Sequence, residues 1–338
     1  MPATIALAGD TMLGRNVADA LAADPAAPLV SPDVADHLAG ADAFVINLEC
    51  CISSRGERFR DRRKPFFFRA PPVAAQRLAS LGVRAVTLAN NHALDYGPVA
   101  LLDTLEHLDA AGIAAVGAGA DVTAARAPVV VGCGDVRLRL VAFSDHPAAY
   151  AAGPEQAGIA LADLDHGLPD WVRHAVQPGP DADAVLVTPH WGPNMTAAPI
   201  ARVRRAAEAL VAAGATLVAG HSAHVFHGAA PRVLFDLGDF LDDYAVDPEL
   251  RNDLGLLWLV ELDRDGPRRI RALPLALDNC FTRTATAAEA DWILHRLETL
   301  CAPFRTAVEA SGEMIELSAT TCAAGSGLPS LPRQSRPR

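Results

Sequence analysis

Several apolar runs in the sequence end on a side chain that can bind a metal ion or move a proton. In α/β sheets, ligands gather outside the carboxyl ends of the strands, so such side chains can converge although they are far apart along the chain. Carboxylate, amide and imidazole donors form a mixed oxygen and nitrogen set that suits Mn, Zn, Fe, Mg or Ca better than copper. The pattern therefore predicts a site for one or two divalent metal ions. The residues at these run ends are Asp10, Asn47, Glu49, Asn91, His92, His190, His221 and His224.

Each of these residues, taken alone, also has an ordinary structural explanation. An aspartate such as Asp10 at a strand end commonly caps a helix or forms a turn, and His190 could be a hydrogen-bonded core histidine. His227 follows no strand, so we interpret it as structural. His146 follows a predicted strand and His295 lies in the last predicted helix, and the sequence leaves open whether either lines the site. The recurrence of the pattern at five strand ends is what favours a metal centre.

Short apolar strands alternate with amphipathic helices along most of the chain, and these elements must position the residues named above. The alternation predicts an α/β fold with mixed sheets. Residues 127–144 predict a β-hairpin that turns at residues 132–135. We expect one domain over residues 1–320 and a disordered tail over residues 321–338, which are rich in Gly, Ser, Pro and Arg. Other strands are predicted at residues 4–8, 43–48, 84–89, 232–240, 255–266 and 268–277, the last three consecutive and antiparallel, and helices at 98–110, 200–213 and 287–307.

The charge and the apolar content narrow the classes of partner and compartment. The net charge of −11 disfavours nucleic acid and anionic membranes as partners. No apolar run reaches the roughly 18 residues of a membrane span, and the N-terminus lacks the features of a signal peptide, so we predict a cytoplasmic protein. The six cysteines show no CxxC spacing, which favours reduced, buried thiols. The sequence leaves the oligomeric state open.

A basic run, RGERFRDRRK at residues 55–64, follows the strand that carries Glu49 and so is expected at the same edge of the sheet. It could hold an acidic peptide or a C-terminal carboxylate, for which arginine forks are well suited. The alternative is a solvated loop whose charges pair with its own acidic residues. Phe66–Phe68, directly afterwards, could fill the core as a strand, or one of them could line an apolar pocket. The candidate substrate-binding residues are Arg58, Arg60, Arg62 and Lys64.

The motifs GDTMLGR, NLE, LANNHALDYG, GAG, HWG, GHSAHV and FDLGDF are similar, in order and spacing, to those of the CapA family of poly-γ-glutamate capsule-type proteins. The resemblance covers about residues 3–245. It implies a metallophosphatase-like, four-layer α/β/β/α sandwich with a metal centre at the sheet edges.

The resemblance also implies roles for individual residues. Asp10 resembles the first metal ligand, Glu49 a bridging carboxylate and Asn91 an amide ligand. His92 resembles an acid/base residue beside the metal. His190 and His221 resemble ligands of one metal and His224 a ligand of the other.

Two positions depart from the pattern of metallophosphatases. Met12 stands where a histidine ligand is usual, which favours one metal, or one tight and one labile metal, over a robust pair. Asp239 stands where an asparagine is usual and could be an extra base, a partner of a ligand or a turn residue. Asn90 replaces a glycine.

One metal with nearby bases suits proton abstraction next to a carbonyl, because the metal polarises the carbonyl oxygen. The sequence therefore favours a metal-dependent epimerase that inverts a Cα in a ribosomal, lasso-type precursor peptide, a reaction implied by relatives of the resembled family. The alternatives are a metallohydrolase, either phosphoesterase or peptidase, a capsule-type poly-γ-glutamate synthesis protein, and a non-catalytic binding module. The candidate catalytic residues are His92, Asp10, His224 and Asp239.

Overall fold

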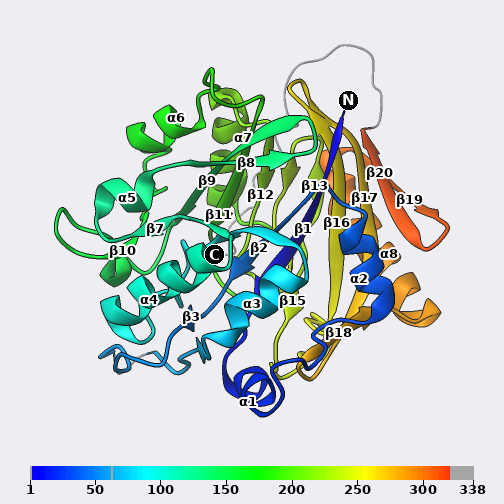
Figure 1. Cartoon of the computed structure of the whole chain (residues 1–338). Helices are drawn as coiled ribbons and strands as arrows, with labels where there is room; N and C mark the ends of the chain where they lie inside the picture. The colour runs from blue at the N-terminus through cyan, green and yellow to red at the C-terminus, as the bar shows by residue number, and fades with distance from the viewer. Residues whose placement is uncertain (1, 62–63, 320–338) are drawn as a thin grey trace, which may run out of the picture.

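Two β-sheets lie face to face, with helices on their outer sides, in the computed structural model (Figure 1). The structure describes residues 2–61 and 64–319 of the 338-residue chain. In this part of the chain the elements form four layers, helices, sheet, sheet and helices, which confirms the predicted sandwich. The predicted tail lies outside the described residues.

The larger sheet is mixed: it contains both parallel and antiparallel strand pairs. Its central strands β1, β2, β5 and β6 are parallel, so their carboxyl ends share one edge. On the other side of β1, β15 also pairs with it in parallel, whereas β16, β17, β18, β19 and β20 make antiparallel pairs. The order is β19-β20-β17-β16-β1-β2-β5-β6, with β15 beside β1 and β18 beside β17. The strands are β1 (Ala3–Thr11), β2 (Ala43–Leu48), β5 (Val83–Thr87), β6 (Ala114–Val116), β15 (Asp239–Leu241), β16 (Leu254–Asp263), β17 (Gly266–Asp278), β18 (Phe281–Thr284), β19 (Thr306–Ser311) and β20 (Met314–Ala319).

The smaller sheet has the order β13-β14-β12-β11-β9-β8, and its strands β9, β11, β12 and β14 are parallel. The predicted hairpin is confirmed as β8 and β9. Apolar side chains from the two sheets, such as Leu186 and Trp258, form one buried cluster between them. The strands are β8 (Val129–Cys133), β9 (Val136–Ser144), β11 (Ala184–His190), β12 (Leu217–Ala219), β13 (Ala229–Ala230) and β14 (Val233–Leu234), and two small ladders are β3 (Cys51–Ile52) with β4 (Arg69–Ala70) and β7 (Ala118–Gly119) with β10 (Gly158–Ile159).

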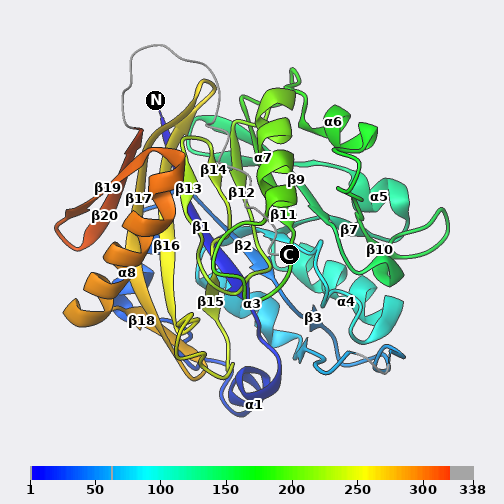
Figure 2. The ribbon, with the colours of Figure 1, turned by 180° about the vertical axis from the view of Figure 1, so that it is seen from behind.

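The helices cover the outer faces, as opposite views show (Figures 1 and 2). Helices α1 to α4 bury their apolar faces on the larger sheet, and α6 and α7 on the smaller one. Helix α8 instead packs its apolar face into the cluster shared by both sheets. In the described residues no helix is long and apolar enough to cross a membrane. The helices are α1 (Arg15–Ala23), α2 (Pro32–Ala39), α3 (Val73–Ser80), α4 (Gly97–Ala110), α5 (Val122–Arg126), α6 (Asp170–Val176), α7 (Ala201–Ala213), α8 (Ala287–Cys301), and the 3₁₀ turns η1 (Ala148–Tyr150) and η2 (Ala302–Phe304).

The prediction of one strand over residues 232–240 is wrong. Strand β14 pairs with β12 in the smaller sheet, whereas β15 pairs with β1 in the larger sheet. Between them Gly238 adopts φ 76°, a conformation that favours glycine. The chain thus crosses from one sheet to the other here, and it places Asp239 directly beside Asp10. The strands predicted at 255–266 and 268–277 are confirmed as the antiparallel pair β16 and β17.

Gly9 is where this crossing touches β1 most closely. A Cβ atom on Gly9 would lie 1.7 Å from the carbonyl oxygen of Gly238, which accepts a hydrogen bond of 2.8 Å from the Asp10 amide. Gly9→Ala should therefore lower the free energy of unfolding by about 3 kcal/mol, because the two backbones must separate. Gly132→Ala is the matched control, since a Cβ there meets nothing within 4 Å. Equal denaturant midpoints for the two variants would contradict the prediction.

Candidate metal centre

The two sheets bring their parallel strand ends together at one place. From the larger sheet come Asp10 at the end of β1 and Glu49 just after β2, and from the smaller sheet comes His190 at the end of β11. A backbone bridge pairs His190 with His221, which follows β12. His224 lies on the same loop as His221. Each of these side chains is buried, with at most 8% of its residue surface exposed.

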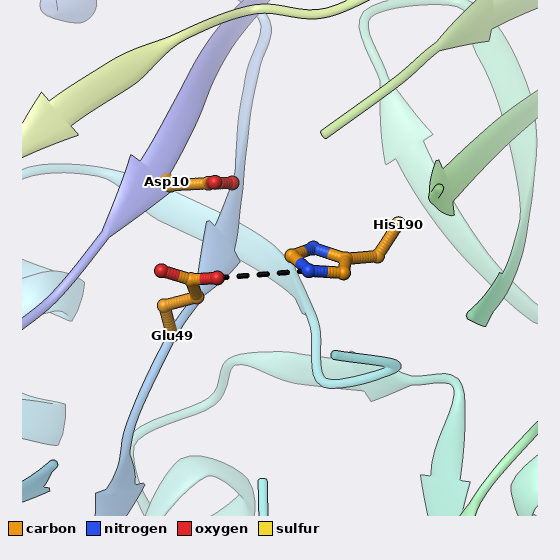
Figure 3. A group of neighbouring side chains, drawn as sticks. All are labelled: Asp10, Glu49 and His190. Atoms are coloured by element: carbon orange, nitrogen blue, oxygen red, sulfur yellow. Dashed lines mark ion pairs between the residues drawn. The ribbon is translucent and has the colours of Figure 1, made fainter. Parts of the chain in front are cut away.

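A first group of potential ligands consists of Asp10, Glu49 and His190, which point toward one another (Figure 3). One donor atom from each lies within 4.8 Å of the others. The His190 Nε2 and Glu49 Oε1 atoms are 3.7 Å apart. Such a set of two carboxylates and an imidazole is a common coordination environment for a divalent metal.

A second group shares Asp10 with the first and adds His224 and Asp239. The His224 Nδ1 atom lies 2.8 Å from Asp239 Oδ1 and 3.5 Å from Asp10 Oδ2. In the described residues, the carboxylate common to both groups is thus Asp10, whereas the family resemblance implied a bridging role for Glu49. Met12, which stands where metallophosphatases usually have a histidine ligand, is buried, and its Sδ accepts the Gly14 amide at 2.9 Å. The second group contains Asp239 as its third potential ligand.

Some of the buried polar atoms that lack a hydrogen-bond partner belong to residues of this centre. Buried polar atoms are almost always paired, because leaving one without a partner costs free energy. Several such atoms in one centre, all with lone pairs for a cation, fit a bound metal. His224 also holds a left-handed backbone, φ 59°, of the kind that clusters at functional sites. Among the described residues, the unpartnered atoms here are Asp10 Oδ2, Glu49 Oε1, Asn91 Oδ1, His190 Nε2, His221 Nδ1 and Asp239 Oδ2.

The electrostatics of the centre favour a cation. Burial raises the pKa of Glu49 well above its ordinary value, and the charge of Asp10 raises it further. Burial and the neighbouring Asp242 and Asp10 raise the pKa of Asp239 in the same way. Burial alone would raise the pKa of Asp10 as well, yet contacts with His221 and His224 hold it below its ordinary value. A divalent ion would offset the repulsion among these carboxylates.

Two asparagines tie the strand ends together, a role that the sequence did not reveal. Asn47 donates to Asp10 Oδ1 at 2.7 Å, and Asn90 donates to Asn47 Oδ1 at 2.9 Å. The Asn90 Oδ1 atom in turn accepts the His92 amide at 2.9 Å. Asn90 therefore links β5 to β2 and β1, and it orients the loop that carries Asn91 and His92.

His92 forms a pair with Asp95, which the sequence analysis missed. The His92 Nδ1 atom lies 2.6 Å from Asp95 Oδ2. The Nε2 atom of His92 takes no part in this contact. The i, i+3 spacing in HALD was the available signal. Lys64 Nζ lies 3.0 Å from Asp95 Oδ1 and donates to the Asn91 carbonyl at 2.7 Å. The ring of Phe68 stacks on His92 with centroids 4.2 Å apart.

The basic run lies partly against the His92–Asp95 pair and partly in solvent. Lys64, predicted to bind substrate, has a side chain only 15% exposed and forms an ion pair with Asp95. Arg60 lies on the exposed loop with its side chain 94% exposed, and Arg58 stacks over Phe67. Arg62 lies outside the described residues. Binding of substrate by the arginines stays a prediction.

Three further histidines, His146, His227 and His295, differ in their position relative to the centre. The ring of His146 lies 5.3 Å from the His190 ring, and its Nδ1 atom is 2.5 Å from Asp145 Oδ1, so it borders the centre. His295 is on the exposed face of α8, where its Nδ1 atom faces the Asp291 carbonyl. His227 is buried with its Nε2 atom 2.8 Å from the Thr196 carbonyl, in agreement with a structural role.

Comparison with known proteins gives matches over most of the chain. Residues 4–244 match the family described as bacterial capsule synthesis protein PGA_cap. A probable polyglutamine synthesis accessory protein of Mycobacterium tuberculosis is 32% identical over 285 residues, covering 78% of this chain and 73% of that protein. The capsule biosynthesis protein CapA of Bacillus anthracis is 27% identical and aligns with 71% of this chain and 60% of its own length. A solved phosphatase structure from Mycoplasma pneumoniae has a TM-score of 0.50 at 13% identity, covering 82% of this chain and 95% of that chain, a likeness of fold.

Metal binding should be visible as stabilisation. Adding Mn²⁺ or Zn²⁺ at about 100 times Kd to metal-stripped protein should raise the free energy of unfolding by about 2.7 kcal/mol. Glu49→Gln should lose this stabilisation, while its metal-free form is at least as stable as the metal-free natural chain, because a buried carboxylate no longer faces Asp10. Thermal unfolding with and without metal, together with metal content by mass spectrometry, measures both. His295→Ala is the control, and full metal stabilisation of Glu49→Gln would contradict the prediction.

Proposed function

The chain belongs to the bacterial capsule synthesis protein family, as its motifs predicted, and on that premise we propose that it is a metal-dependent hydrolase of phosphoesters. The observation that carries this proposal is the pair of potential ligand groups that share Asp10, with the His92–Asp95 pair beside them. Two metal positions joined by one carboxylate suit in-line displacement at phosphorus, because the attacking and leaving oxygens can both be stabilised.

We assign the metal ligands from the donors that converge. Asp10, Glu49 and His190 would hold one ion, and Asp10, His224 and Asp239 would hold the other. His221, whose Nδ1 atom lies 3.3 Å from Asp10 Oδ1, is a further potential ligand, and the family resemblance adds Asn91. Oxygen donors predominate, which favours Mn, Fe or Mg, with Zn also accommodated by the imidazoles. Such ions supply charge stabilisation to phosphoryl oxygens and lower the pKa of water.

His92 is the proton donor in this proposal. Water attacks phosphorus, the ester P–O bond breaks, and the proton on Nε2 of the His92 imidazolium passes to the leaving oxygen, while a proton of the attacking water, carried first by the phosphate product, restores the imidazolium. Asp95 accepts from His92 Nδ1, which orients the ring and stabilises the imidazolium, the form that also carries a proton on Nε2. Lys64 offsets the charge of Asp95 and anchors the backbone of Asn91, so it is a positioning residue.

The names of the relatives suggest the wider role. They are described as a polyglutamine synthesis accessory protein and a capsule biosynthesis protein. We place this chain in a similar accessory role, in which hydrolysis of a phosphoester precedes or follows assembly of a glutamate polymer.

A second candidate function is the metal-dependent peptide epimerase that the sequence favoured. The observation in its favour is a second histidine–carboxylate pair, His146 with Asp145, which borders the centre next to His190. Inversion at a Cα needs a base on one face and an acid on the other. His92 and His146 would take these two roles, and a metal would stabilise the developing negative charge on the carbonyl oxygen.

His92→Ala should lower kcat/KM for an alkyl phosphate by about 10²–10⁴-fold, because the leaving alkoxide no longer receives a proton. The loss should be much smaller for 4-nitrophenyl phosphate, whose leaving group is stable as an anion. Steady-state kinetics of the metal-loaded protein on both esters measures the difference, with His295→Ala as the matched histidine control. An equal loss on both esters would assign His92 a role other than proton donor.

The epimerase alternative predicts exchange without cleavage. Incubation of metal-loaded protein in D₂O with poly-γ-glutamate and with synthetic peptides should then give one deuterium at a Cα and a D-residue, read by mass spectrometry and chiral amino-acid analysis. His146→Ala should abolish the exchange. Hydrolysis of phosphoesters with no Cα exchange would exclude the epimerase and leave the hydrolase.

A further inference from the structure

We propose that Arg15, Phe66, Phe68 and Tyr244 form a subsite that binds a planar aromatic group on the leaving side of the substrate. The inference rests on the proposed phosphoester hydrolysis and adds to it the class of leaving group. The four residues, called here the aromatic subsite, extend from Phe68, which is buried beside His92, to Phe66, which is exposed. Arg15 begins α1, the two phenylalanines lie just before β4, and Tyr244 follows β15.

The inner part of the aromatic subsite touches the proposed catalytic groups. The ring of Phe68 stacks on His92, and the Tyr244 hydroxyl donates to Glu49 Oε2 at 3.3 Å. The Phe68 and Tyr244 rings lie 5.7 Å apart. A group that receives a proton from His92 must therefore lie close to the Phe68 ring.

The outer part is an exposed ring that continues the same stack. Phe66 is 55% exposed, and its ring is nearly parallel to that of Phe68, at 10° with centroids 6.4 Å apart. Isolated exposed apolar side chains are common on protein surfaces. Phe66 is not isolated, since Phe66, Phe68 and His92 form a continuous series of stacked rings from solvent to the proton donor.

Arg15 completes the aromatic subsite without adding net charge. Its guanidinium carbon lies 5.8 Å from the Phe66 centroid, 5.6 Å from that of Phe68 and 5.7 Å from that of Tyr244. The guanidinium pairs with Asp243 Oδ1 at 2.6 Å, so the positive charge is already balanced. Flat, neutralised surfaces select a partner by stacking rather than by charge.

The backbone holds this arrangement firmly. Arg15 has φ 50°, a left-handed conformation that costs free energy for a side chain other than glycine. A Cβ on the preceding Gly14 would lie 3.0 Å from Phe68 Cα, so the two loops are in direct contact. The start of α1 and the segment that carries Phe68 are therefore fixed relative to each other.

Benzyl phosphate and cyclohexylmethyl phosphate test the inference, because their leaving alcohols are similar in size and acidity and differ in planarity. The natural chain should prefer the benzyl ester by about two- to ten-fold in kcat/KM, the range expected for aromatic stacking. Phe66→Leu keeps an exposed apolar side chain but should bring this preference to parity, chiefly by lowering kcat/KM for the benzyl ester. Val130→Ala, at an exposed residue of β8, is the control and should keep the preference.

The corresponding phosphonates give a second measurement that needs no turnover. Calorimetry on metal-loaded protein should show tighter binding of benzylphosphonate than of cyclohexylmethylphosphonate, and Phe66→Leu should remove the difference. Equal treatment of the two esters and of the two phosphonates by the natural chain would overturn the subsite. Failure to hydrolyse either ester, with a phosphonate preference that depends on Phe66, would overturn the proposed hydrolysis and leave the aromatic subsite standing.

Discussion

The structure depends on holding like-charged carboxylates together in a buried place. Asp10, Glu49 and Asp239 are each at most 2% exposed, and they meet where the two sheets join. Like charges in a medium of low dielectric constant repel strongly, and each also loses its hydration. His190, His221 and His224 lie among them and offset part of this cost. A divalent cation would offset the remainder, so the residues that destabilise the metal-free fold are those that a metal would stabilise.

Backbone contacts hold the segments that carry these carboxylates next to one another. The crossing between β14 and β15 puts Asp239 in register with Asp10, and the absence of a side chain at Gly9 lets the two backbones approach. Asn47 and Asn90 then bond the ends of β1, β2 and β5 into one edge. Because these contacts join segments far apart in the chain, the centre exists only when both sheets are complete.

The features of the fold and of the centre that depend on local sequence pattern could be predicted from the sequence. The parallel strands, the hairpin and the polar residues at strand ends follow from periodicity of two and from the rule that ligands gather at carboxyl ends. Prediction from the sequence failed where the outcome depends on long-range partners. Residues 232–240 look like one apolar strand, and the division between two sheets is decided by strands β1 and β12. The contacts of Asn90 and Lys64 were likewise not predicted, because they are made with Asn47 and Asp95, residues 43 and 31 positions away in the sequence.

The loops at the centre each serve two functions along a short length of chain. The chain from the end of β1 to the start of α1 supplies Asp10 and then Arg15, and the chain around β15 supplies Asp239 and then Tyr244. The segment after β2 supplies Glu49 and returns with Phe68. Ligands lie where a strand ends and are fixed by the sheet, whereas the residues beyond them lie on connecting segments, which commonly vary more than strands do. The metal chemistry can therefore stay constant within such a fold while the group recognised beside it is set by a few loop positions.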